Sequence, residues 1–117
     1  MYRPTLSDIR SAHRRIEGFV TRTPLHRYRT LESLINAELY IKHENHQPLG
    51  AFKMRGGINH LLKMSSDQKK KGVVTASSGN HGQSIAYAAK LHNIKAVIIV
   101  PENANPGKVA SMKSLGA

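Results

Sequence analysis

The sequence has no cysteine, no tryptophan, few acidic residues and no long apolar run. Without cysteine the chain can form neither a disulfide bond nor a thiolate metal site, and its seven histidines lack the spacing of a metal motif. The longest apolar stretch, residues 96–100, is far too short to cross a membrane. Residues 1–4 lead into charged sequence and not into an apolar signal segment. We therefore expect a cytoplasmic protein with no metal site and no membrane partner.

Basic residues outnumber acidic residues, with 18 Lys and Arg against 7 Asp and Glu and a formal net charge of +11. One interpretation is a non-catalytic basic fragment that binds nucleic acid or a partner chain. Nucleic-acid surfaces, however, combine clustered charge with stacking aromatic residues. Here the only basic run is residues 69–71, and aromatic residues make up 5% of the chain. We therefore expect no nucleic-acid partner. An anionic small ligand, a solvated basic surface or an acidic remainder of a longer chain would each explain the excess.

Apolar periodicity divides the chain into alternating strands and helices. Helical spacing and capping residues predict helices over residues 5–18, 31–35, 51–64, 83–92 and 108–115. Short apolar or alternating runs predict strands over residues 37–43, 72–76 and 95–100. This order predicts an α/β fold with a parallel sheet. Because a further strand should follow the last helix, we expect the 117 residues to be the amino-terminal part of a larger fold.

One candidate for chemistry is the lysine within residues 50–57, GAFKMRGG. A lysine amine can condense with an aldehyde once it has lost its proton, which desolvation and nearby cations favour. Lys53 would lie in the first turn of a helix, where the positive helix end and Arg55 both disfavour a charged amine. Phe52 could offer an apolar face to a flat ring. An ordinary surface lysine explains the same residues, and the glycine pair that follows fits either ligand approach or tight helix packing.

The second candidate is the polar turn of residues 77–83, SSGNHGQ, between a strand and a helix. Open α/β sheets place ligands beyond the carboxyl ends of their strands. Such a turn presents backbone N–H groups and a helix amino end, which together favour an anion such as a carboxylate or a phosphate. Asn80 adds an amide, and the serines add hydroxyl groups. A capped helix after a glycine turn has the same composition, so these residues alone leave both interpretations open.

Together the two segments resemble the fold-type-II pyridoxal-phosphate enzymes, and most closely the threonine/serine dehydratases and serine racemases. The resemblance runs along almost all of the chain and includes four blocks, residues 22–25, 42–57, 77–83 and 101–109. It implies a three-layer α/β fold with a parallel sheet, similar to that of tryptophan synthase β and here truncated. Residues 1–72 would then belong to the large cofactor domain, and residues 73–117 to the small α/β domain.

The resemblance also implies a role for each matched side chain. Lys53 would bind the pyridoxal phosphate cofactor covalently and move protons on one face of the substrate, while Phe52 would pack beside the pyridine ring. Asn80 would hydrogen-bond the phenolic oxygen of the cofactor. Ser78 matches the serine that acts as acid or base on the opposite face in the racemases. The substrate carboxylate would be held by Ser77, Gly79, Asn80 and His81.

The implied reaction is β-elimination from a hydroxy amino acid such as threonine or serine, which yields a 2-oxo acid and ammonia. A serine racemase-type isomerase is the alternative, because the same Ser-Ser-Gly-Asn pattern occurs in both groups. The glycine-rich phosphate loop of the family is absent from this sequence, and Ala51 stands where many relatives have serine. We therefore expect the isolated chain to be inactive, and the intact enzyme to be a homo-oligomer that acts on a small amino acid.

Overall fold

The computed structural model describes residues 3–117, so Met1 and Tyr2, the start of the predicted large-domain segment, lie outside the described residues. The chain forms helices and short strands in this order: α1 (Leu6–Ile16), β1 (Leu25–Arg27), α2 (Arg29–Ile35), β2 (Tyr40–Lys42), the 3-10 helix η1 (Glu44–His46), α3 (Lys53–Lys63), α4 (Ser66–Lys71), β3 (Val73–Ala76), α5 (Asn80–Leu91), β4 (Ala96–Ile99) and α6 (Pro106–Ser114).

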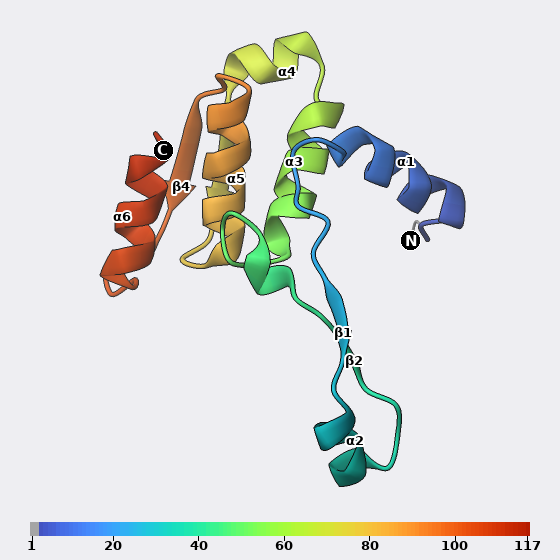
Figure 1. Ribbon diagram of the computed structural model, residues 1–117. Coiled ribbons are helices and arrows are strands. Elements are labelled where there is room, and N and C mark those ends of the chain that lie inside the picture. Colours follow the sequence, from blue (N-terminus) through green and yellow to red (C-terminus); the bar gives the residue numbers. More distant parts are fainter. Residues whose placement is uncertain (1–2) are drawn as a thin grey trace.

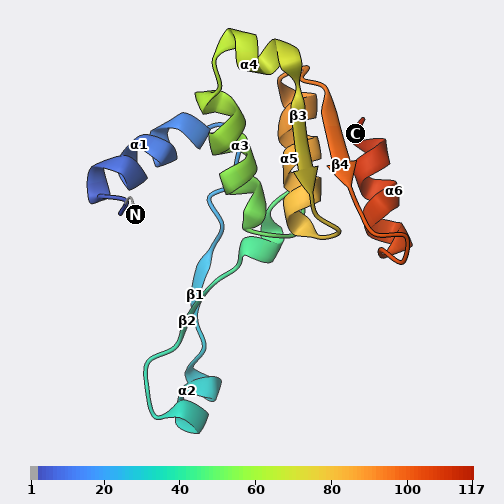
Figure 2. The ribbon, with the colours of Figure 1, turned by 180° about the vertical axis from the view of Figure 1, so that it is seen from behind.

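The elements form a packed body and an arm that projects from it (Figure 1). β1 and β2 pair antiparallel, with Leu25 opposite Lys42, and carry α2 at the tip of the arm. The reverse view shows the same arrangement, with β3 and α5 side by side in the body (Figure 2). The side chains of Leu25, Leu34 and Tyr40 in the arm are more than half exposed, and no residue of the arm belongs to the core. The arm therefore does not contribute to the core.

The body is built on the parallel pair β3–β4, in which Val73 lies opposite Ala96 and Ala76 opposite Ile99. This pairing confirms the predicted parallel arrangement from residue 72 onward. Helix α5 covers one face of the pair, and the main hydrophobic core lies between that helix, the strands and α3. The core contains Ile16, Met54, Ile58, Leu61, Ile85, Ala88, Ala89, Ile94 and Ala96. The predicted boundary between two domains near residue 72 stays a prediction.

Local sequence explains where several helices begin. Thr5 and Asp8 form a reciprocal capping box at the start of α1, and Ser65 and Gln68 form another at the start of α4. Asn105 accepts a hydrogen bond from the third residue of α6, whose first residue is a proline. Helix α5, by contrast, follows Gly79 and has no side-chain cap, so its first N–H groups lack a side-chain acceptor.

Three sequence-based expectations need correction. The helix expected over residues 83–92 begins three residues earlier, at Asn80, directly after Gly79 as its N-cap residue. Strand β1 and helix α4 were not predicted at all. β1 is too short to show alternation. α4 carries three consecutive lysines and no buried residue, so it has no apolar periodicity. It begins at its capping box and ends at Gly72, whose positive φ of 85° favours glycine.

Helices α3 and α5 cross in close contact at Gly57. A Cβ atom added to Gly57 would lie 2.0 Å from the hydroxyl oxygen of Ser84 and 2.7 Å from its carbonyl oxygen. Ser84 is fully buried at this crossing. Gly56, the other member of the glycine pair, has open space where a Cβ would be. The pair therefore combines one packing glycine with one that the packing does not require.

We predict that Gly57→Ala destabilises the protein by about 3 kcal/mol, because the added methyl group must push against the backbone of α5. The matched control is Gly56→Ala, which adds the same group in the same helix without a clash and should stabilise it by up to about 1 kcal/mol. Urea denaturation of both variants measures the difference. Equal effects of the two substitutions would contradict the proposed role of the crossing.

Candidate active site

Lys53 is the first residue of α3 and follows the loop from η1. The helix is fixed to the body by Met54, Ile58 and Leu61, which are completely buried. Lys53 itself is half-buried, and within residues 3–117 its amine has no hydrogen-bond or ion-pair partner. Phe52, directly before it, is 65% exposed. A reactive amine and an uncovered aromatic ring therefore lie next to each other at the amino end of this helix.

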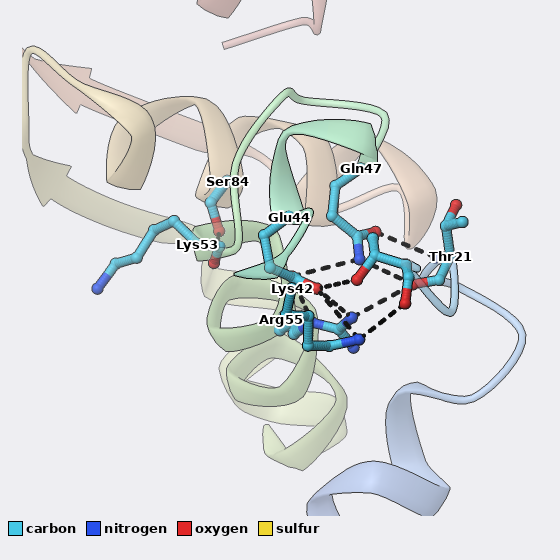
Figure 3. A network of polar contacts seen from close by, with 8 residues as sticks. Thr21, Lys42, Glu44, Gln47, Lys53, Arg55 and Ser84 are labelled. Atoms are coloured by element: carbon cyan, nitrogen blue, oxygen red, sulfur yellow. Dashed lines mark hydrogen bonds and ion pairs between the residues drawn. The ribbon is translucent and has the colours of Figure 1, made fainter. Parts of the chain in front are cut away.

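On the opposite side of α3, Arg55 binds Glu44 with two hydrogen bonds, from Nε at 2.7 Å and from Nη2 at 2.8 Å. Glu44 also accepts hydrogen bonds from Thr23 and Gln47, and Gln47 in turn binds both backbone groups of Thr21. This network ties η1 and the loop before β1 to α3. The side chain of Lys53 extends away from it (Figure 3).

The network explains two electrostatic features. The Arg55 guanidinium, against the smaller opposing effect of burial, lowers the pKa of Glu44 from 4.5 to about 2, with help from the Thr23 hydroxyl. The same pair raises the pKa of Arg55. The charge of Arg55 is therefore compensated by Glu44. The expected effect of Arg55 on the Lys53 amine stays a prediction.

The predicted anion-binding turn lies between β3 and α5. Ser77 extends the sheet, since its N–H donates to the carbonyl of Ile99 at 3.0 Å, and its hydroxyl accepts from the N–H of Gly79 at 3.3 Å. Ser78 and Asn80 are exposed. His81 is half-buried, and its Nδ1 atom is buried without any hydrogen-bond partner among the described residues. The turn thus offers uncapped N–H groups, an amide and an unsatisfied imidazole nitrogen.

A hydrogen bond connects Lys53 to the helix that follows the polar turn. The buried hydroxyl of Ser84, one turn into α5, donates to the carbonyl oxygen of Lys53 at 2.9 Å (Figure 3). It fixes the first turn of α3 against the first half of α5, and so sets the position of Lys53 relative to residues 77–83. A cavity of about 320 Å³ opens beside them and is lined by Gly56, Thr75 and His81. Gly56 lies three residues after Lys53, on the same face of α3.

These residues fit an anionic aldehyde cofactor with an amino-acid substrate. The free amine matches an aldehyde, the exposed aromatic ring matches a flat ring, and the uncapped helix amino end matches a carboxylate.

Within residues 3–117, no group of three or more histidine or acidic side chains could hold a metal ion. No helix of that part of the chain is long and apolar enough to span a membrane.

Comparison with known proteins decides the family. The sequence pattern of the family described as pyridoxal-phosphate dependent enzyme matches residues 16–117. The chain belongs to this family. It therefore shares the α/β fold of fold-type-II enzymes and a cofactor, pyridoxal phosphate, that the family is defined by. This confirms both the predicted fold class and the predicted cofactor.

The relatives of this family member include both lyases and racemases. The chain is 45% identical over 114 residues to L-threo-3-hydroxyaspartate ammonia-lyase from Saccharomyces cerevisiae. It is 44% identical over 113 residues to a serine racemase from Dictyostelium discoideum. Each match covers 97% of this chain and 35% of the relative. An L-threonine ammonia-lyase from Thermotoga maritima is 41% identical, with 97% and 28% covered. The structure of maize serine racemase superposes with a TM-score of 0.93 at 40% identity, over 99% of this chain and 35% of that one. The chain thus spans about a third of the length of its relatives.

Two residues that support the site carried little signal in the sequence. Ser84 lies within an apolar helix face, where a small polar residue is easily taken for a neutral packing position. Only the packing of α3 against α5 shows that Ser84 lies opposite Gly57. Glu44 lies in residues 42–57, one of the blocks that resemble the family, but the sequence assigned it no role. The scarcity of acidic residues could have marked it, because a rare carboxylate amid many cations tends to be an ion-pair partner.

We predict that Glu44 stabilises the fold at neutral pH and that this contribution is lost in acid. Because its pKa is lower in the folded chain than in the unfolded chain, the stability is fully present above about pH 4.5 and disappears as pH falls toward 2. Allowing for partial exposure, we expect Glu44→Gln to cost about 2 kcal/mol near pH 6 and almost nothing near pH 2. Denaturation curves at several pH values measure this, with the exposed Glu102→Gln as control. A cost that does not change with pH would contradict the ion-pair explanation.

Proposed function

We propose that this chain carries the lysine-bearing part of a pyridoxal-phosphate dependent lyase that converts a hydroxy amino acid such as threonine or serine to a 2-oxo acid and ammonia. The observation that supports this most directly is the hydrogen bond from Ser84 to the backbone carbonyl of Lys53, which joins the first turn of α3 to α5, the helix whose amino end is uncapped. An amine and a carboxylate site in one place are what an amino-acid enzyme of this family requires. Relatives that act as ammonia-lyases support the same choice.

In this proposal each residue has a defined task. Lys53 holds the cofactor and moves the α-proton of the substrate, while the exposed ring of Phe52 covers one face of the site. The N–H groups and side chains of residues 77–81 hold the substrate carboxylate, and Asn80 donates to the phenolic oxygen of the cofactor. When bound, pyridoxal phosphate supplies the electron-withdrawing ring that makes the α-proton acidic.

A racemase of serine is the second candidate function. The hydroxyl of Ser78 is exposed and has no hydrogen-bond partner within residues 3–117, so it is available as an acid or base on the second face of a substrate. A serine racemase at 44% identity supports this candidate as strongly as the ammonia-lyase at 45% supports the first. The two reactions differ in whether the β-hydroxyl leaves or the α-proton returns from the other side.

Covalent trapping tests the assignment of Lys53. We expect that incubation with pyridoxal phosphate, reduction with borohydride and mass spectrometry of the digest will place the main adduct on Lys53. Lys53→Ala should lose this adduct, whereas Lys71→Ala, which removes an exposed lysine of α4, should keep it. Labelling spread evenly over the exposed lysines would contradict the assignment.

Product analysis separates the two candidate reactions in an intact enzyme that includes this segment. The lyase proposal predicts ammonia and a 2-oxo acid from L-serine or L-threonine, with Ser78→Ala keeping most of this activity. The racemase proposal predicts D-serine, and at least a 100-fold loss of D-serine formation in Ser78→Ala, in the range typical of a lost general acid or base.

We expect the 117-residue chain alone to release no ammonia, since it lacks the glycine-rich phosphate loop. Steady ammonia release that depends on Lys53 would overturn this expectation.

A further inference from the structure

A lysine from a distant part of the sequence reaches the predicted anion-binding turn. The ammonium group of Lys108 donates a hydrogen bond to Oδ1 of Asn80 at 2.7 Å, across 28 residues of sequence. Lys108 is the third residue of α6, where its backbone N–H is held by the side chain of Asn105 at 3.2 Å. Asn80 is the first residue of α5. The contact therefore joins the amino ends of two helices that start at the same edge of the β3–β4 sheet.

Two further contacts keep the two helices in this alignment. One turn along each helix, Nε2 of Gln83 donates to the hydroxyl of Ser111 at 3.0 Å. The two helices also pack closely at Gly82. A Cβ atom added there would lie 2.8 Å from the methyl carbon of Met112. Helix α6 thus packs against the turn of residues 77–83. Packing therefore brings the backbone of Lys108 close to Asn80, and the hydrogen bond then places its ammonium group.

The chemistry of the contact fixes the direction of the Asn80 amide. An ammonium group has three donors and no acceptor, so only the oxygen of an amide can face it. The Nδ2 group of Asn80 then points to the other side, and within residues 3–117 it donates to no acceptor. An amide held in this way offers two donors and no acceptor to whatever occupies the site. That is the arrangement that an anionic oxygen requires and a hydroxyl donor does not.

We propose that Lys108 is a positioning residue, whose ammonium holds the amide oxygen of Asn80 and thereby makes Asn80 a fixed donor to an anionic oxygen of the cofactor. Without Lys108 the amide can turn over, and in half of its orientations it presents an acceptor to the anion. The inference deepens the proposed function, because it rests on residues 77–83 as the ligand site. It adds a residue to that site that lies outside both predicted segments.

The first test needs no ligand. The side-chain amide signals of Asn80 are recorded by ¹H–¹⁵N NMR in the 117-residue chain and are identified by their loss in Asn80→Asp. In Lys108→Met we expect these signals to move to the position of a free amide. Lys108→Arg, which also only donates, should keep them near the wild-type position. Lys113→Met removes the same charge further along α6 and should leave them unchanged. Asn80 signals that are the same in Lys108→Met and in the wild type would overturn the proposal.

The second test measures the consequence for binding. The pyridoxal phosphate concentration that half-saturates borohydride trapping at Lys53 should rise about five- to tenfold in Lys108→Met, as for the loss of one charge-assisted hydrogen bond. It should stay within about twofold in Lys108→Arg and Lys113→Met. An unchanged value in Lys108→Met would refute the positioning role. If the wild type is not trapped at Lys53 at all, the proposed function fails, while the ligand-free NMR test still decides whether Lys108 orients Asn80.

Discussion

The site depends on the contact between Gly57 in α3 and Ser84 in α5. The absence of a side chain at Gly57 allows the helices to approach until the Ser84 hydroxyl reaches the carbonyl oxygen of Lys53. A polar group buried this deeply is costly unless it is hydrogen-bonded, so the bond also fixes the rotation of α5 relative to α3. With both helices fixed, the amine at the start of one and the uncapped N–H groups at the start of the other have a defined relative position. This is the basis for our proposal that Lys53 and residues 77–83 form one site.

The two faces of α3 at its first turn have separate tasks. Arg55 faces Glu44 and joins the helix to η1 and to the loop before β1 through a set of mutually satisfied polar groups. Lys53 faces the other way and keeps its amine unpaired (Figure 3). Within residues 3–117, Arg55 has a carboxylate partner and Lys53 has none. In a chain with an excess of basic residues, Glu44 thus pairs with Arg55 and leaves the amine of Lys53 available for the proposed chemistry.

The sequence alone predicted the parallel β3–β4 pair, helices α3 and α5, and both segments of the site, because buried apolar runs and glycine-containing turns are local features. It failed for β1 and α4, where a three-residue strand and a lysine-rich helix have no apolar periodicity. It did not predict the contacts of Ser84, Arg55 and Lys108, because their partners lie 11 to 31 residues away. A local pattern indicates which residues could react. Only the packed structure shows which residues hold them in place.

The most direct test of this account is a backbone ¹H–¹⁵N NMR titration of the chain with pyridoxal phosphate. If Lys53 and the turn form one site, the amide signals at the start of α3 and those of residues 77–83 should shift together, with a single common midpoint. The signals of the arm, residues 25–42, should stay in place. Shifts confined to one of the two segments, or different midpoints for the two, would contradict the claim that the α3–α5 crossing unites them.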